Sequence, residues 1–232
     1  MTTPRDRLIV ALDVQDAASA RAMVDRLAGH VGMFKVGTQI FTAAGPEFVR
    51  EVIARGEKVF LDLKFHDIPN TVAGAVSSAG QLGVSLVDVH ALGGKDMMEA
   101  AVGALPAMGI RLIAITILTS HKEETLGTIG VSGSVADSVR RLAVLSREAG
   151  ADGVVASPQE VALVREACGP DFLIVTPGIR PVGSSRGDQS RTATPAAAVA
   201  AGADYIVVGR PILEAADPAA AADAIVRELT GR

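Results

Sequence analysis

The sequence predicts an α/β protein that folds as a single (β/α)8 TIM barrel over residues 1–232. Eight short apolar runs rich in Val and Ile alternate with longer segments whose apolar residues recur at helical spacing. No low-complexity linker or change of composition divides the chain, and 232 residues lie within the range that such barrels occupy as one domain. The alternative is an open doubly wound sheet, because hydrophobic periodicity does not reveal whether a sheet closes.

The expected strands are apolar along most of their length, as parallel strands covered on both faces are. They span residues 8–14, 33–37, 58–65, 85–91, 111–118, 153–157, 172–177 and 205–209. The helices that follow them are expected to begin near Ala17, Pro46, Asn70, Lys95, Val135, Pro158, Pro195 and Pro211. Several begin with proline, which suits the first helical turn because the amide that proline lacks would have no partner there.

Two connections, residues 119–133 and 178–194, are longer and more polar than the others. Each follows an expected strand, and the loops at the carboxyl ends of the strands are where a barrel places its binding groups. We therefore expect the functional site at that end of the barrel.

Composition and charge exclude several classes of partner. The chain has 22 basic and 26 acidic residues, one Tyr and no Trp, so it offers neither a basic stripe nor stacking aromatics, and nucleic acid is not expected as a partner. No apolar run approaches the roughly 20 residues that cross a bilayer, so no membrane segment is expected. The lone Cys168 cannot form an internal disulfide, which fits a reducing compartment, and we predict a cytoplasmic protein.

Neither a metal nor an organic cofactor is expected. His66 and His90 follow or end strands, as metal ligands can, but no acidic and histidine cluster at ligand spacing accompanies them. The chain also shows no evident lysine-imine motif or cofactor fingerprint.

The third expected strand carries charges that an apolar strand does not ordinarily contain. In KVFLDLKFHDIPNT, Asp62 and Lys64 interrupt the apolar run and Asp67 follows in the turn. Because side chains alternate along a strand, Asp62 and Lys64 share one face, which near the carboxyl end would point into the barrel mouth. The alternative is a solvated strand end with a weak surface ion pair.

Two further charges lie at the ends of the first two strands, Asp13 in LIVALDV and Lys35 in MFKVG. Asp13 alone could cap the next helix, and Lys35 alone could extend its charge to water. Four charged residues at the ends of three neighbouring strands are harder to explain in this way. Lysines and aspartates gathered in a partly desolvated pocket would hold one another ionised and form a preorganised electrostatic site.

A second group of residues indicates a phosphate site. Gly209 and Arg210, in VVGRPI, follow the eighth strand, where backbone amides at the start of the final helix can face an anion and a guanidinium can donate two hydrogen bonds. The seventh loop contains Arg180, Arg186, Gln189 and Arg191. Barrels frequently bind phosphate with the loops after strands seven and eight, although a Gly-Arg pair by itself is more often a turn with a surface arginine.

These motifs, taken in order, resemble the orotidine 5'-phosphate decarboxylase family. The resemblance rests on ALD at Asp13, KVG at Lys35, LDLKFHDIPNT, TILTS at 116–120, PGIR at Arg180, GDQSR around Gln189 and VGRPI at Arg210. It covers nearly the whole chain, and DLKFHDIPNT is its most specific part. The resemblance implies a cofactor-independent carboxy-lyase that converts orotidine 5'-phosphate to uridine 5'-phosphate and CO2 in de novo pyrimidine biosynthesis.

The resemblance also implies roles for individual residues. The catalytic array would alternate in charge and consist of Lys35, Asp62, Lys64 and Asp67. Lys64 would be the proton donor, and Asp62 would lie beside the substrate carboxylate. The other substrate-binding residues would be Asp13 and Lys35 at the ribose, Thr119 at the pyrimidine, and Arg180, Gln189, Gly209 and Arg210 around the phosphate. Asp67, Ile68 and Thr71 would reach into the neighbouring subunit's site, so the protein would be a homodimer with shared active sites.

Two other functions compete with this one. A sugar-phosphate decarboxylase or aldolase of the same barrel superfamily could carry a similar carboxylate and lysine pattern, but would use magnesium. A noncatalytic barrel that senses a phosphorylated metabolite is the second alternative. The cluster of Asp62, Lys64 and Asp67 argues against a sensor, because gathering charges in a pocket costs stability unless the charges act together.

Overall fold

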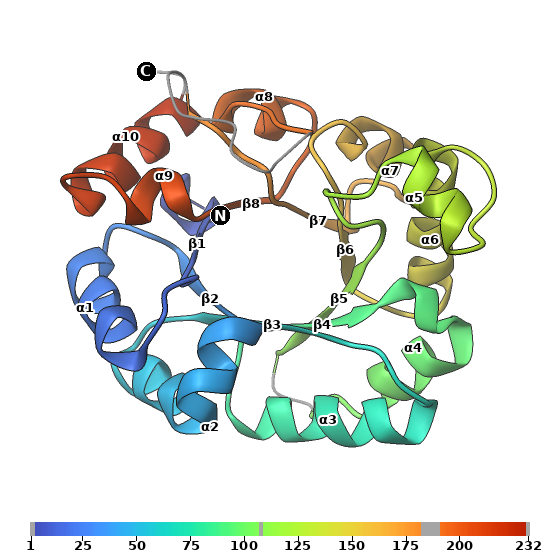
Figure 1. The fold of residues 1–232 in the computed structure, drawn as a ribbon, viewed down its shortest axis with the longest axis horizontal. Helices are drawn as coiled ribbons and strands as arrows, with labels where there is room; N and C mark the ends of the chain where they lie inside the picture. The colour runs from blue at the N-terminus through green and yellow to red at the C-terminus, as the bar shows by residue number, and fades with distance from the viewer. Residues whose placement is uncertain (1–2, 107–108, 182–190, 231–232) are drawn as a thin grey trace.

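The computed structural model describes residues 3–106, 109–181 and 191–230, and its sheet closes into a barrel. All strands are parallel and pair in chain order around the ring, with β8 returning to β1 (Figure 1). They are β1 (Leu8–Ala11), β2 (Met33–Gly37), β3 (Val59–Phe65), β4 (Leu86–His90), β5 (Arg111–Ile115), β6 (Gly153–Val155), β7 (Leu173–Thr176) and β8 (Tyr205–Val208). The predicted (β/α)8 barrel is confirmed, and the open sheet is wrong.

The helices lie outside the ring and cover the outer face of the sheet (Figure 1). They are α1 (Ala17–Leu27), α2 (Thr38–Ala54), α3 (Pro69–Gln81), α4 (Lys95–Gly103), α5 (Glu123–Thr128), α6 (Val135–Glu148), α7 (Val161–Cys168), α8 (Pro195–Ala200), α9 (Arg210–Leu213) and α10 (Pro218–Leu229). Short 3-10 helices, η1 (Arg5–Arg7) and η2 (Ala91–Gly93), precede β1 and follow β4. Among the described residues, every helix is too short or too polar to cross a membrane.

Most strands end earlier than the apolar runs predicted. The run 8–14 ends as a strand at Ala11, and the run 111–118 ends at Ile115. Leu12 and Ile117, just beyond these ends, are nevertheless buried at 0% and 3% exposure. The apolar runs therefore predicted burial correctly. They overestimated strand length, because burial continues past the last residue of the hydrogen-bonded ladder.

Three helical features differ from the prediction. The helix expected near Pro46 begins at Thr38, and Pro46 opens its second part after a kink at Gly45, whose φ of 69° lies in the left-handed region that glycine favours. The polar loop 119–133 contains the short helix α5. The helix expected from Pro211 ends at Leu213, so Gly209 precedes the four-residue α9 and not the final helix.

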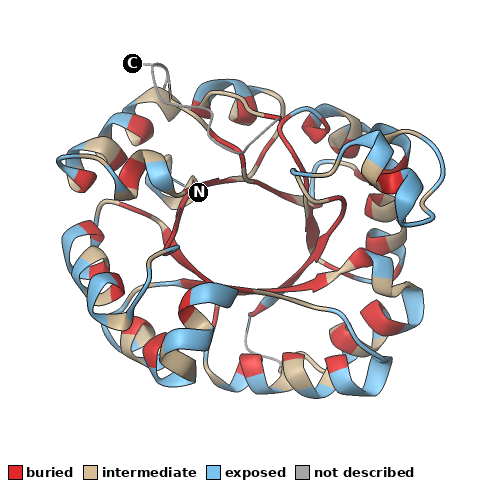
Figure 2. Cartoon of the chain, in the orientation of Figure 1, coloured by how far each residue is buried: buried red, intermediate tan, exposed pale blue. Residues whose placement is uncertain are grey.

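Apolar side chains fill both the inside of the barrel and the space between the sheet and the helices, where the strands and the inward helix faces are buried (Figure 2). The inner layer draws residues from all eight strands, namely Ile9, Ala11, Met33, Phe60, Leu86, Ile113, Val155, Val175 and Val207, together with Leu173 and Tyr205. The interior is thus a packed core that supports the mouth from below.

Aspartates fix strand ends on the opposite side of the barrel from the mouth. Asp152, just before β6, accepts a hydrogen bond from the Leu112 amide of β5 at 2.8 Å. Asp204, just before β8, accepts one from the Ile174 amide of β7 at 2.8 Å and pairs with Arg165. These carboxylates satisfy amides at the start of strands that the ladder leaves without partners.

Candidate active site

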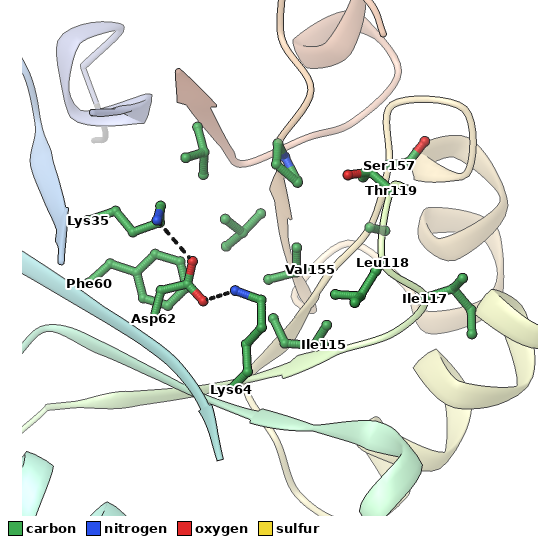
Figure 3. Close-up of a pocket in the computed structure, with 14 residues that line it drawn as sticks. Lys35, Phe60, Asp62, Lys64, Ile115, Ile117, Leu118, Thr119, Val155 and Ser157 are labelled. Carbon is green, nitrogen blue, oxygen red and sulfur yellow. Dashed lines mark hydrogen bonds and ion pairs between the residues drawn. The ribbon is translucent and has the colours of Figure 1, made fainter. Parts of the chain in front are cut away.

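A row of charged side chains lies inside the barrel mouth, on β2 and β3 (Figure 3). Asp62 pairs with two lysines: its Oδ2 lies 3.2 Å from Lys35 Nζ, and its Oδ1 accepts a hydrogen bond from Lys64 Nζ. Lys35 also donates to Oδ1 of Asp13, just beyond β1, at 3.2 Å. Residues from three neighbouring strand ends therefore meet in a row that alternates in charge.

Burial and pairing act against each other in this row. Lys35 and Asp62 are only 9% and 7% exposed. Burial disfavours the charge of Asp62, but Lys35, a hydrogen bond with Asp88, and Lys64 hold its pKa well below the usual range. Burial also opposes the charge of Lys35, yet Asp62 and Asp13 raise its pKa above the ordinary value. Both groups are ionised at neutral pH, so the charges are in place before a ligand binds.

Asp88 belongs to this network, and the sequence analysis did not single it out. It lies on β4 beneath the mouth, is fully buried, and accepts the backbone N–H of Lys64 at 2.7 Å. A local signal was present, because a carboxylate within the apolar strand LVDVH is as unusual as Asp62 and Lys64 are in β3.

An apolar cavity of about 150 Å³ opens beside Lys64 (Figure 3). Its apolar lining comprises Phe60, Ile115, Ile117, Leu118, Val155, Ala156, Val175, Pro177 and Val207. Thr119, expected at the pyrimidine, lines this cavity, as does Ser157, which the sequence analysis missed because a serine after a strand carries no distinctive signal. A mostly apolar wall with a few hydroxyl groups is suited to holding a planar polar ring in one orientation.

A second cavity, of about 360 Å³, shares Lys35, Pro177 and Val207 with the first, so the two adjoin. Its lining brings together four predicted ligand-binding residues, Asp13, Arg180, Gly209 and Arg210. Two guanidinium groups beside a glycine backbone form a site suited to a phosphate. Asp62 and Lys64 line the first cavity, which we call the ring cavity, Asp13 lines the second, which we call the phosphate cavity, and Lys35 lines both.

Other predicted site residues lie elsewhere. Asp67, Ile68 and Thr71 are exposed on the rim around the start of α3 and line neither cavity. Asp67 accepts the amide of Ile68 at 2.6 Å, and the Ile68 side chain is 67% exposed, which is unusual for a large apolar residue. Gln189 lies outside the described residues.

Arg191 is not placed in the phosphate cavity, where its loop suggested it would act. It is 9% exposed, donates to Glu160 at 2.7 Å and to the Leu118 carbonyl at 3.0 Å. Arg191 therefore ties the end of the seventh loop to the loops after β5 and β6. Glu160, which the sequence analysis did not identify, is 4% exposed and lies just before α7.

The two histidines near the mouth stack on each other, with ring centroids 5.4 Å apart. Burial, then the nearby His66 and Lys64, lower the pKa of His90 to about 4, so its ring is neutral at pH 7 and its Nδ1 accepts the Leu92 amide. Within the described ranges, no group of three or more His, Cys, Asp or Glu side chains is arranged to hold a metal ion.

Comparison with known proteins places this geometry in context. A family model described as the orotidine 5'-phosphate decarboxylase / HUMPS family matches residues 6–225. Proteins named orotidine 5'-phosphate decarboxylase from Moorella thermoacetica and Geobacter sulfurreducens are 55% and 54% identical, each over 97% of this chain and 92% and 96% of their own lengths. The crystal structure of orotidine 5'-phosphate decarboxylase from Lactobacillus acidophilus aligns with a TM-score of 0.86 at 40% identity, covering 96% of this chain and 98% of that one.

The buried pair of Arg191 and Glu160 gives a first prediction. Arg191→Met should destabilise the protein by about 3 to 5 kcal/mol, because it leaves the Glu160 carboxylate buried without its partner. Adding Glu160→Met to the same chain should recover much of that loss, since the uncompensated charge is then removed as well. Urea unfolding of the wild type, both single variants and the double variant measures the coupling. Strictly additive losses would show that the two side chains do not act as a pair.

Proposed function

The chain belongs to the orotidine 5'-phosphate decarboxylase / HUMPS family, and we propose that it is a carboxy-lyase that converts orotidine 5'-phosphate to uridine 5'-phosphate and CO2 without a cofactor. In this role it acts in de novo pyrimidine biosynthesis, in the cytoplasm. The observation that carries the proposal is the row of Lys35, Asp62 and Lys64, which lines the ring cavity and reaches the adjoining phosphate cavity at Lys35. A nucleotide that spans the row places its ring, its ribose and its phosphate against groups of matching chemistry.

The ring cavity receives the pyrimidine, with Thr119 at its polar edge. Asp13 and Lys35 contact the ribose, and the substrate carboxylate lies beside Asp62. The phosphate binds in the phosphate cavity, where it contacts Arg180, Arg210 and the backbone at Gly209. The family resemblance alone assigns Gln189 to the same end of the substrate.

Lys64 carries the chemical step. When the bond between the ring carbon and the carboxylate breaks, CO2 leaves and the electron pair stays on the ring carbon. The ammonium of Lys64 stabilises that negative charge and then transfers its proton to the carbon, and the amine regains a proton from water. Asp62 holds Lys64 in position and disfavours the substrate carboxylate in the ground state, but stabilisation by the preorganised cations is the larger effect.

The phosphate end contributes without touching the reacting atoms. Its charged hydrogen bonds form with the substrate and persist in the transition state, so they supply binding energy that can hold the ring against Lys64. Removing phosphate contacts should therefore weaken binding of the whole nucleotide.

The active form is a homodimer in which each chain completes its partner's site. Asp67, Ile68 and Thr71 lie on the rim outside their own chain's cavities, and Ile68 is largely exposed in the single chain. An interface there would bury the Ile68 side chain and bring Asp67 to the charged row of the other chain, where it would complete the catalytic array with Lys35, Asp62 and Lys64. Asp67 is close to Lys64 in sequence yet lines neither cavity of its own chain, and a shared active site explains this.

The direct test is an absorbance assay with orotidine 5'-phosphate, in the presence and absence of a chelator. The wild type should turn over equally in both, whereas the magnesium-dependent alternative requires loss of activity with chelator. Lys64→Ala should abolish turnover and leave the fold intact, because the residue lies at the mouth and Asp62 keeps its second partner, Lys35.

Lys58→Ala is the matched control for Lys64→Ala, because Lys58 is an exposed lysine just before the same strand, at the other end of the barrel. It should keep wild-type turnover. A folded Lys64→Ala enzyme with near-normal activity would exclude Lys64 as the proton donor.

Arg210→Ala should chiefly weaken substrate binding, by about 1.5 to 3 kcal/mol if one charged hydrogen-bonding contact is lost. The nucleoside orotidine, which lacks the phosphate, should respond little to the same change. Arg140→Ala, on the exposed face of α6, serves as the control for loss of an arginine. Equal impairment with nucleotide and nucleoside would mean that Arg210 maintains the fold and does not bind phosphate.

The shared site can be tested by mixing two inactive variants, Lys64→Ala and Asp67→Ala. In a mixed dimer one site collects both substitutions, while the other combines an intact Lys64 with an intact Asp67 from the partner. Random exchange of equal amounts makes about half of the dimers mixed, so about a quarter of all sites should recover.

The measurement is activity after the two variants are unfolded and refolded together, with each refolded alone as control. Confirmed mixed dimers without recovered activity would mean that Asp67 serves its own chain.

A further inference from the structure

Lys64 has a strained backbone. Its φ is 52°, and among the described residues it is the single residue other than glycine in the left-handed region. The strand is irregular at the same point, because the register between β3 and β4 shifts between Leu61 and Phe65. A long side chain in the left-handed region costs free energy, so the surroundings must stabilise this conformation.

Asp88 supplies that stabilisation from the neighbouring strand. Its Oδ1 accepts the Lys64 amide at 2.7 Å, within the stretch where the register between β3 and β4 shifts. Asp88 is 0% exposed. In the ladder between β4 and β5, it is the register partner of Ile113. The Asp88 carboxyl group is therefore fully buried and anchored to the backbone of β3.

The second oxygen of Asp88 indicates its protonation state. Oδ2 is buried and no N–H or O–H of another described residue donates to it, while the carboxyl group of Asp62 is close enough to act directly on that of Asp88. Two carboxyl groups can share a hydrogen bond only if one of them carries a proton. Two lysine ammonium groups pair with Asp62 and stabilise its negative charge, whereas no lysine ammonium group of the described residues forms an ion pair with Asp88. The proton is therefore assigned to Asp88.

We propose that Asp88 is a positioning residue for the decarboxylation: as a neutral carboxylic acid it accepts the Lys64 amide through one oxygen and donates its proton to Asp62 through the other. One buried side chain thus fixes both the backbone of the proton donor and the orientation of the carboxylate between the lysines. Burial, followed by the negative charge of Asp62, raises the pKa of Asp88 well above its usual value, which agrees with this assignment.

The neutral state matters for the reaction. Within one chain, Lys35 and Lys64 balance Asp13 and Asp62 in the row, whereas an ionised Asp88 would add a further negative charge next to Lys64. A protonated Asp88 keeps the positive charge of Lys64 available to the transition state.

The kinetic test compares two substitutions at Asp88. Asp88→Ala removes both contacts and should lower kcat about 100-fold, the scale expected when a reacting group is misplaced by about 1 Å, while affinity for uridine 5'-phosphate changes little. Asp88→Asn keeps an acceptor for the Lys64 amide and a donor for Asp62, and should restore kcat to within about threefold of wild type. Asp152→Ala is the matched control, because it removes the same aspartate-to-amide hydrogen bond at the opposite end of the barrel.

Asp152→Ala should lower stability and leave kcat unchanged. If Asp88→Ala also loses only stability, with normal kcat in the folded fraction, Asp88 is structural and the positioning role is wrong. The same conclusion follows if Asp88→Asn fails to restore the turnover of a folded enzyme.

The proton can be tested without turnover, and even if Asp88→Ala does not fold. A neutral Asp88 keeps its proton in the folded state, but in the unfolded chain it loses that proton above pH of about 4. Unfolding then releases a proton, so rising pH favours unfolding of the wild type, while Asn at this position has no proton to lose. The charged groups that act on Asp88, Asp62 and Lys64, are the same in both proteins.

Urea unfolding measured upward from pH of about 5, where the unfolded-state aspartate is ionised, therefore distinguishes the two protonation states by the sign of the pH dependence. The unfolding constant of wild type should rise relative to that of Asp88→Asn by up to about tenfold per pH unit. Parallel pH dependences would mean that Asp88 is ionised and would overturn the inference. Because the positioning role rests on the proposed decarboxylation, an inactive wild type would refute that function, whereas the unfolding measurement decides the protonation state in either case.

Discussion

The Asp62 carboxylate is buried in the barrel mouth between two lysines, and the free energy of keeping that charge away from water constrains the residues around it. A buried ion that loses one partner is left uncompensated, which costs several kcal/mol, so the members of such a network are held as a unit. Lys35 comes from β2, Lys64 from β3 and Asp88 from β4. The network therefore depends on the pairing of three neighbouring strands and on the closure that holds them.

The apolar layer beneath the mouth strengthens these charges. Phe60 and Val207 belong both to the inner layer of the barrel and to the lining of the ring cavity, so the floor of the site is also part of the core. A low-dielectric floor makes each electrostatic interaction stronger than in water, and the packed strands prevent the lysines from moving apart. Stability and preorganisation thus arise from the same side chains.

Local irregularities are concentrated around the charged row. The register shift in β3, the left-handed conformation of Lys64 and the buried Asp88 all lie within one short stretch of two strands. At the opposite end of the barrel, Asp152 and Asp204 make comparable hydrogen bonds to regular strand amides without strain. Departures from regular structure persist only where the surroundings stabilise them, and here those surroundings are the charged row itself.

The sequence determined the barrel and the chemical character of its mouth. Apolar periodicity placed all eight strands, and the charges in KVFLDLKFHDIPNT singled out Asp62 and Lys64, because both signals reside in residue type and spacing along the chain. Tertiary structure alone decided that Asp88 joins them, that Arg191 binds Glu160, and that Asp67 is exposed and lines neither cavity of its own chain. Those contacts depend on strand register, a bulge and the paths of loops distant in sequence, and a pattern of residue types along one chain contains no measure of such distances.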